Sequence, residues 1–212
     1  MRILLTLLFT ACQISLAEST RFEEQNFSLN VPAGWQKGET PPNALAQYHS
    51  QDATKGVAIM SFKTSAPNPI TALEKFVSGA KEAAAKKQIA IIAEHDQVIH
   101  GVTFRVYSMV MPGNISILST AAVVGDGTAY SIQGFSRGTD AAKDPEILAI
   151  INSFNLLSPP SALVTSPVTA EKSEAYKMGQ YFGKWSMIAL LVGAVVIMIQ
   201  KAVKPKPKKK TR

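Results

Sequence analysis

The sequence predicts an α+β domain, in which an antiparallel sheet carries packed helices, followed by a single C-terminal transmembrane helix. Apolar and polar residues alternate in several segments, as they do in half-buried strands. Two other segments open on Asn-Pro or Asp-Pro and then repeat apolar residues at helical spacing. A long apolar run near the C-terminus is followed by a cluster of lysines, which is typical of a membrane span with a cytoplasmic end.

The sequence of the first part of the domain predicts three strands. Phe27–Val31 alternates apolar and polar residues, and Pro32-Ala33-Gly34 ends this strand. Residues 45–50 and 56–62 read as two further strands, with a turn at residues 52–55 between them.

A long helix is predicted after these strands, ending near Lys87. Asn68 is suited to cap it, and Pro69 suits its first position. The apolar residues that follow at spacings of three and four define the expected inner face: Ile70, Leu73, Val77, Ala80 and Ala84.

The second half of the domain predicts a four-stranded meander and a closing helix. The expected strands cover residues 89–99, 102–111, 115–124 and 128–135. Glycine-containing turns separate them: His100-Gly101, Pro112-Gly113-Asn114 and Gly125-Asp126-Gly127. The last helix opens at Asp144-Pro145 and is expected to bury the following apolar residues: Ile147, Leu148, Ile150, Ile151 and Phe154. An antiparallel sheet with helices packed on it is the natural closure.

The charge distribution argues against nucleic-acid binding. The whole chain carries a net charge of +7. Residues 18–160 carry 11 Lys and Arg against 13 Asp and Glu, which is a net charge of −2, whereas residues 186–212 carry 7 basic and no acidic residues. A nucleic-acid footprint should lie on the folded domain. The single cysteine, Cys12, lies in the apolar leader, so the domain is expected to fold without a disulfide.

The two ends of the chain predict a membrane-anchored envelope protein. Residues 1–17 have the charged start, apolar run and small residues of a cleaved signal peptide, so residues 18–157 are expected to form an extracytoplasmic domain. A linker follows at residues 158–180. Residues 181–203 combine an aromatic belt with an apolar run and read as the transmembrane helix, and residues 204–212 form a basic cytoplasmic tail.

The location that follows is the bacterial inner membrane, with the domain in the periplasm. The alternative is the endoplasmic-reticulum membrane of a eukaryote, because Lys209 and Lys210 match a dilysine retrieval pattern. Small residues at Gly179 and Gly183, and at Ala189 and Gly193, lie four apart and can permit close helix contact, so helix-mediated self-association stays open.

The domain resembles the PsbP-like family, which includes PsbP, DcrB and Mog-type proteins. The likeness spans about residues 22–157 and rests on Phe27–Trp35 (FSLNVPAGW), the helix after a hairpin, the meander and the closing Ile150–Phe154 segment. The resemblance implies an α/β/α sandwich with an antiparallel sheet, and mostly non-enzymatic roles in binding or assembling other proteins. The resemblance identifies no partner-binding residues in this chain, because no partner-binding motif of the family matches its sequence.

Two patterns suggest chemistry, and neither meets the requirements of a site. Gly134-Phe135-Ser136-Arg137-Gly138 matches the G-x-S-x-G nucleophile motif, but that motif needs an immediate helix and a downstream histidine. His95 lies between two acids, yet neighbouring residues of a strand point to opposite faces, and His100 lies in a predicted turn. We therefore predict no catalytic, cofactor-binding or metal-binding residues, and no cofactor.

The function expected from the sequence is a non-catalytic module that binds or assembles another envelope or membrane protein. A small-ligand or lipid carrier with a groove between sheet and helix is the first alternative. A serine hydrolase acting through Ser136 is the second and weaker alternative.

Overall fold

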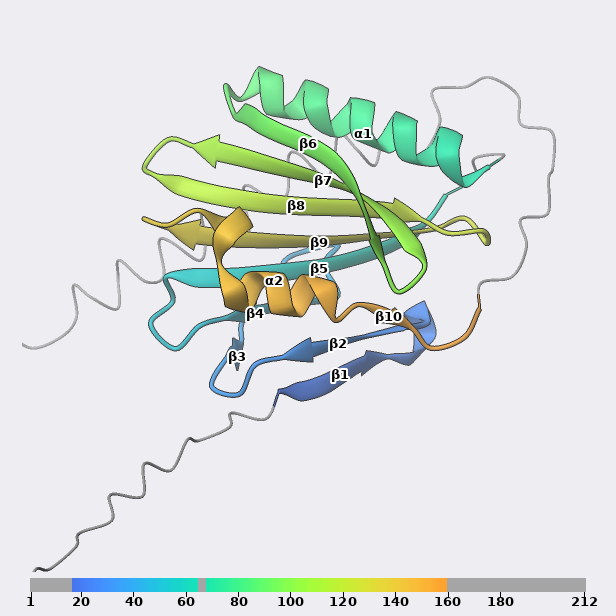
Figure 1. Cartoon of the computed structure of the whole chain (residues 1–212), viewed down its shortest axis with the longest axis horizontal. Helices are drawn as coiled ribbons and strands as arrows, with labels where there is room; N and C mark the ends of the chain where they lie inside the picture. The colour runs from blue at the N-terminus through green and yellow to red at the C-terminus, as the bar shows by residue number, and fades with distance from the viewer. Residues whose placement is uncertain (1–16, 65–67, 160–212) are drawn as a thin grey trace, which may run out of the picture.

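The structure is a computed structural model that describes residues 17–64 and 68–159 (Figure 1). Its strands are β1 (Glu18–Phe22), β2 (Phe27–Val31), β3 (Gln36–Lys37), β4 (Ala46–His49), β5 (Lys55–Lys63), β6 (Ala90–Ile99), β7 (Val102–Met111), β8 (Ile115–Val123), β9 (Thr128–Arg137) and β10 (Asn155–Leu156). Its helices are α1 (Pro69–Lys86) and α2 (Pro145–Asn152), with short 3-10 turns η1 (Glu23–Gln25) and η2 (Ala141–Lys143).

The predicted signal peptide (apart from Ala17), the linker from residue 160 onward, the transmembrane helix and the basic tail lie outside the described residues. Within residues 17–64 and 68–159, no helix combines the length and apolarity that a membrane span requires.

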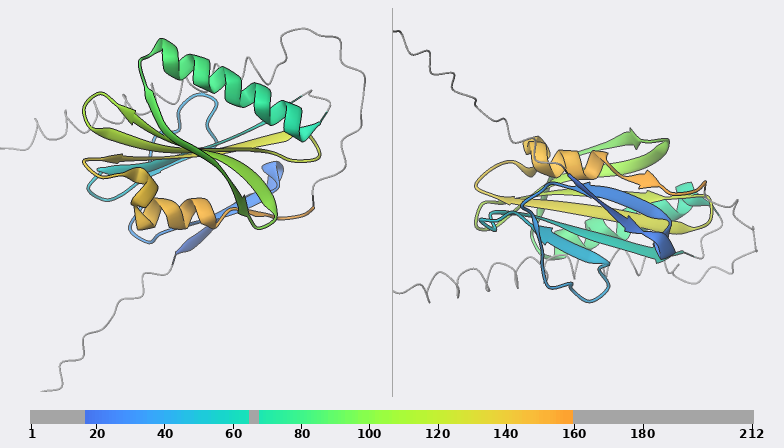
Figure 2. Two further views of the ribbon diagram at one scale, coloured as in Figure 1. Left: turned by 45° about the horizontal axis from the view of Figure 1, so that its top comes forward. Right: turned by 90° about the horizontal axis from the view of Figure 1, so that it is seen from below.

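Two antiparallel sheets and two helices form three layers. The main sheet has the strand order β3-β4-β5-β9-β8-β7-β6, and the small sheet has the order β1-β2-β10. Helix α1 covers one face of the main sheet, and α2 with the small sheet covers the other (Figures 1 and 2). We call these the α1 face and the α2 face. Each of the strands β6, β7, β8 and β9 pairs with the next through a short hairpin, and together they form the meander that the glycine turns predict.

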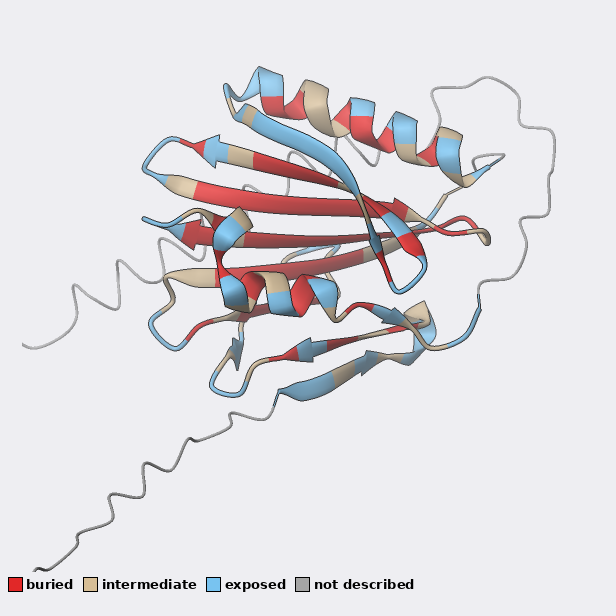
Figure 3. Cartoon of the chain, in the orientation of Figure 1, coloured by how far each residue is buried: buried red, intermediate tan, exposed pale blue. Residues whose placement is uncertain are grey.

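The α2 face carries the larger core. Its interior is an aromatic cluster centred on Phe154, which is fully buried. Phe154 lies edge-on to Phe104 at 5.0 Å between ring centroids and stacks on Phe27 at 5.5 Å. Tyr130 completes the cluster and donates its hydroxyl to the carbonyl oxygen of Gln25 at 2.8 Å. The central strands are buried along most of their length, whereas β6 is exposed along most of its length (Figure 3).

The α1 face has a small apolar core and a row of polar side chains. Its buried apolar cluster comprises Ala58, Met60, Phe76 and Ala121. In register across the sheet, from β6 to β4, lie Glu94, Tyr107, Ser119, Gln133, Ala58 and Gln47. Tyr107 and Ser131 are buried on this face, and neither hydroxyl has a hydrogen-bond partner among the described residues.

The fold class and the elements of the meander agree with the sequence prediction, but the single sheet does not. Strand β2 forms as predicted over Phe27–Val31, yet it pairs with β1 and β10 in a separate sheet. The two partners carried little signal: β1 is mostly exposed, and β10 is only two residues long. Short or polar strands of this kind are defined by tertiary pairing rather than by an alternating pattern.

The inner faces of both helices also differ from the prediction. Helix α1 buries Ala72, Phe76 and Ala83 in addition to Val77 and Ala84, whereas Ile70 is 72% exposed. Ile70 is in phase with the buried Val77 and Ala84, so its exposure follows from its place in the first turn and not from its helical phase. In α2, Leu148 is only half-buried, and Phe154 is buried from a position after the helix has ended.

Candidate functional site

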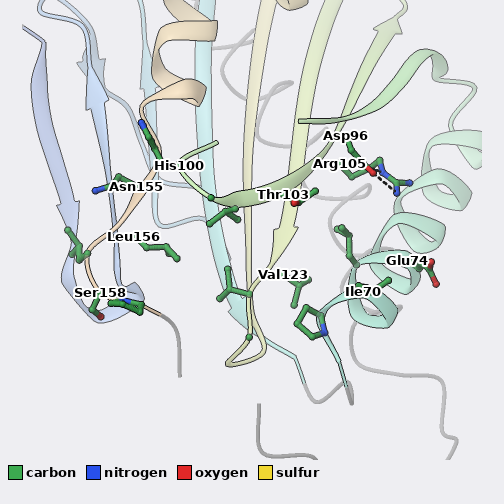
Figure 4. A pocket seen from close by; sticks show the side chains of 18 residues that line it. Ile70, Glu74, Asp96, His100, Thr103, Arg105, Val123, Asn155, Leu156 and Ser158 are labelled. Atoms are coloured by element: carbon green, nitrogen blue, oxygen red, sulfur yellow. Dashed lines mark hydrogen bonds and ion pairs between the residues drawn. The ribbon is translucent and has the colours of Figure 1, made fainter. Parts of the chain in front are cut away.

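A groove of about 820 Å³ crosses one end of the main sheet (Figure 4). One wall is the start of α1, the other is β10 with the residues after it, and the β6–β7 hairpin and the end of β8 form the floor. Its lining residues are Pro69, Ile70, Leu73, Glu74, Asp96, His100, Gly101, Val102, Thr103, Arg105, Val123, Val124, Gly125, Asn155, Leu156, Leu157, Ser158 and Pro159.

The α1 wall is positioned by the helix cap. Asn68 adopts an extended backbone and its side chain accepts a hydrogen bond from the N–H of Thr71 at 2.7 Å, while Pro69 occupies the first helical position. This start holds Ile70 beside the groove with most of its side chain exposed. An exposed isoleucine in the first turn contributes little to folding and offers apolar surface to a binding partner.

The β6 side of the groove is charged. Arg105 on β7 pairs with Asp96 and, at 2.8 Å, with Glu94, and Lys81 of α1 pairs with Glu94 at 2.6 Å. The Lys81 ammonium, and then the Arg105 guanidinium, hold the pKa of Glu94 below its usual range. Glu74 lines the same groove and has no ion-pair partner among residues 17–64 and 68–159. Three carboxylates therefore share two cations, which leaves this end acidic.

The β10 wall of the groove is held by side chains that hydrogen-bond to its backbone. His100 and Gly101 both have positive φ, 44° and 81°, and form a two-residue hairpin turn of the type that suits a twisted sheet. The Nδ1 atom of His100 lies 2.7 Å from the carbonyl oxygen of Phe154. Asn26 holds the segment after β10, because its side chain bonds both the N–H and the carbonyl oxygen of Ser158 at 2.9 Å.

The groove combines an apolar floor with an acidic rim and no buried nucleophile. Val102 and Val124 are buried, Leu73, Val123 and Leu156 are half-buried, and Thr103 is exposed at the centre. Because the groove is open to solvent along Ile70 and Thr103, a ligand lying in it would keep one side exposed. Small-molecule sites usually bury most of their ligand, so the shape is better suited to a segment of polypeptide.

The G-x-S-x-G match has a packing explanation. Ser136 is 1% exposed and lies within β9, paired with Lys55 and Ser116, rather than at a strand-to-helix turn. A Cβ on Gly134 would lie 2.2 Å from Cγ2 of Ile147, so this glycine allows α2 to approach the sheet. Gly138 has a φ of 83° in the turn after the strand. The hydroxyl of Ser136 contacts that of Thr139, and no histidine hydrogen-bonds to it.

The structure keeps the three histidines in separate places. His95 is exposed on β6, and His100 lies in the predicted turn. His49 on β4 is half-buried and its Nδ1 atom lies 3.2 Å from the carbonyl oxygen of Ser50. Among residues 17–64 and 68–159, no three His, Cys, Asp or Glu side chains form a group that could hold a metal ion.

Sequence reasoning did not find the groove, although it anticipated a groove between sheet and helix for the carrier alternative. The groove depends on β10, which was not predicted, and on the exposure of Ile70 in the first turn of α1. The sequence carried no signal for the exposure of Ile70, because Ile70 shares the helical phase of Val77 and Ala84, which are buried.

No family model matches the chain, and no curated protein matches it in sequence. Solved structures do match it in fold. The solution structure of cyanobacterial PsbP (CyanoP) from Synechocystis sp. PCC 6803 superposes with a TM-score of 0.53 at 10% identity, covering 69% of this chain and 95% of that one. The described domain therefore has a PsbP-like fold, in agreement with the fold that the sequence resemblance implies.

Two further structures match more loosely. A protein from Bacteroides thetaiotaomicron gives a TM-score of 0.43 at 17% identity, covering 62% of this chain and 45% of that one. A protein of unknown function from Pseudomonas aeruginosa gives 0.33 at 14% identity, covering 60% and 87%. This chain thus spans less than half of the Bacteroides protein.

Proposed function

We propose that the domain is a non-catalytic binding module, tethered at the membrane outside the cytoplasm, that docks a polypeptide segment of another envelope protein in its groove. The observation that carries this proposal is the combination of an open groove of about 820 Å³ with Ile70, 72% exposed, on its rim. Isolated exposed apolar residues are ordinary, but one that adjoins a groove with an apolar floor adds to a continuous binding surface.

The tether in this proposal comes from the sequence. The predicted linker begins at residue 158, and residues 155–159 form one wall of the groove. A membrane anchor beyond this linker would keep the groove near the bilayer, where the concentration of a membrane partner is high. The acidic rim disfavours direct docking on an anionic lipid surface, which would require basic side chains at this end.

The proposal can be tested by photo-crosslinking in the native host with the full-length chain. A photo-reactive phenylalanine is placed at Ile70, and the control places it at Lys143, whose side chain is 84% exposed on a different part of the domain. We expect one discrete protein adduct from position 70 and none from position 143. Peptide mapping should place the crosslink in one extended segment of the partner.

A groove-filling variant sharpens this test. Thr103 is exposed at the centre of the groove, so Thr103→Trp should occupy the space without disturbing the core, and Thr103→Val is its matched control. The adduct should disappear with Thr103→Trp and persist with Thr103→Val. An adduct that survives Thr103→Trp, or that forms equally from position 143, would contradict docking in the groove.

A small-ligand or lipid carrier is the second candidate. The volume of the groove falls within the range of about 300–1,000 Å³ that ligand sites occupy. A lipid or metabolite that co-purifies with the chain, detected by native mass spectrometry and lost in Thr103→Trp but not in Thr103→Val, would favour this candidate over a polypeptide partner.

A further inference from the structure

We infer that β6 is a docking strand, whose open edge accepts an extended polypeptide segment with alternating apolar and basic side chains as an eighth strand of the main sheet. This inference rests on the proposed function, because it specifies how a partner segment at the groove would be held and which chemistry it would have.

The length of β6 sets it apart from the other edges of the described sheets. The edge strands β3 and β10 have two residues each and β1 has five, whereas β6 has ten. Proteins usually shorten or cover an edge strand, because its unpaired N–H and C=O groups invite another strand to pair. A ten-residue exposed edge is a natural template for strand addition.

The hairpin register determines which backbone groups face outward. Ile99 pairs with Val102 across the two-residue turn, and in such hairpins these flanking residues exchange backbone hydrogen bonds. Gln97 and His95 then bond inward to β7 in the same way. Glu94, Asp96 and Val98 therefore direct their N–H and C=O groups away from the sheet. A bulge between Ile91 and Ala93 ends this regular stretch, so residues 94–98 form the usable edge.

The side chains along this edge specify the partner. Val98 is 67% exposed, and the side chain of Asp96 is 53% exposed while it pairs with Arg105. Asp96 also lines the groove, so the docking edge and the groove form one continuous surface. Glu94, Asp96 and Val98 lie two residues apart and share one face of the sheet. Since Glu74, Glu94 and Asp96 outnumber Lys81 and Arg105 here, a segment with a basic residue at every second position would complement the strand, because it places basic side chains opposite Glu94 and Asp96 and its apolar residues on the other face.

Self-pairing of two β6 strands is disfavoured by the same charges. An antiparallel pair centred on Asp96 places this carboxylate opposite its own copy, and a pair centred on His95 places Glu94 opposite Asp96. Like charges directly opposite each other destabilise a strand pair. A pair centred on Gln97 avoids the contact between carboxylates. Within residues 94–98, however, it leaves only Asp96 of each strand opposite Val98 of the other on this face. The edge thus favours a different, basic segment over a second copy.

The test uses the full-length chain and two synthetic ten-residue peptides, one alternating Val and Lys and the other alternating Val and Glu. Binding is followed by fluorescence anisotropy. We expect the basic peptide to bind at least tenfold more tightly than the acidic one. Hydrogen exchange at residues 94–98 should slow in the presence of the basic peptide, because added strand pairing protects their outward N–H groups.

A proline variant separates strand addition from simple charge attraction. Val98→Pro removes one outward N–H without breaking a bond to β7, since proline is tolerated where the N–H of an edge strand faces solvent. It should weaken binding at least tenfold. The matched control, Val98→Thr, keeps the N–H and should weaken binding less than threefold. Unchanged near-ultraviolet circular dichroism of Val98→Pro would establish that the variant is folded.

Each result has a defined meaning. Equal binding of the basic and acidic peptides, or tight binding of the basic peptide to a folded Val98→Pro, overturns the docking strand. If the adduct from position 70 still forms and remains sensitive to Thr103→Trp, the proposed function survives that result. If the adduct is absent, the proposed function fails as well.

Discussion

The two faces of the main sheet are built differently. The α2 face meets a second sheet and a helix over a contiguous core in which Phe27, Phe104, Tyr130 and Phe154 contact one another. The α1 face has a much smaller buried apolar cluster and a row of polar side chains. Folding free energy is thus concentrated on the α2 face, since burial of apolar area is the dominant favourable contribution.

This difference places the candidate site at the weaker layer. The start of α1 forms one wall of the groove, and α1 is linked to β6 by the Lys81–Glu94 ion pair, which is partly exposed. Exposed ion pairs contribute about 0.2–1 kcal/mol. Regions with few buried contacts open locally at a lower free-energy cost than the global core. We expect the α1 side of the groove to adapt to a partner while the α2 face stays rigid.

The strongest test of this comparison removes one aromatic side chain from each face. Phe154→Ala should lower the free energy of unfolding by about 3–5 kcal/mol, because it leaves a cavity in the aromatic cluster. Phe76→Ala should cost less and should increase hydrogen exchange in α1 more than in β7–β9. Urea unfolding and hydrogen exchange of the full-length chain provide the measurements. Equal, global destabilisation by both variants would show that the faces are not energetically distinct.

Two glycines give a smaller but more specific test. In Gly134→Ala the new Cβ meets Ile147 at 2.2 Å against the rigid α2 layer, so we expect a loss of about 1–3 kcal/mol. In Gly56→Ala the Cβ meets the ring of Phe135 at 2.2 Å and the backbone carbonyl oxygen of Tyr48 at 3.0 Å. The ring of Phe135 is only half-buried, whereas Ile147 is fully buried. The cost of Gly56→Ala should therefore be lower than that of Gly134→Ala.

The glycine test has an internal control. In an Ile147→Ala background the clashing Cγ2 atom is absent, so Gly134→Ala should cost much less than it does alone. If the cost of Gly134→Ala is the same in both backgrounds, close approach of α2 is not the reason for glycine at this position.

The sequence was sufficient for the parts of the fold that have strong local patterns. The meander follows from alternation and glycine turns, and helices α1 and α2 follow from Asn68-Pro69 and Asp144-Pro145. The small sheet could not be predicted because β1 is polar and β10 is too short to carry a period. The groove depends on that sheet and on Ile70, whose exposure is decided by how α1 packs and not by its local sequence. Long-range packing therefore accounts for most of what the sequence did not reveal.

The smallest expected effect compares two buried tyrosines on opposite faces. Tyr130→Phe removes the hydrogen bond to the carbonyl oxygen of Gln25 and should cost about 1 kcal/mol at pH 8. Tyr107→Phe removes a buried hydroxyl that has no partner within the described chain, so it should be neutral or slightly stabilising. A loss in Tyr107→Phe as large as that in Tyr130→Phe would reveal a partner for this hydroxyl.

Alkaline pH extends the comparison of the tyrosines. Burial raises the pKa of Tyr130 to about 12, and burial, followed by the nearby Glu94, also raises the pKa of Tyr107. An unfolded tyrosine titrates near pH 10. Because the folded state holds these protons more tightly, their contribution to stability is complete below pH 10 and is lost as the pH rises toward 12. Each Tyr→Phe variant should therefore lose less stability than the wild type between pH 9 and pH 11, measured by urea unfolding. If a variant loses unfolding free energy with pH as steeply as the wild type does, the tyrosine that it replaces is accessible to solvent in the folded wild-type domain. For Tyr107 this would place water beneath α1.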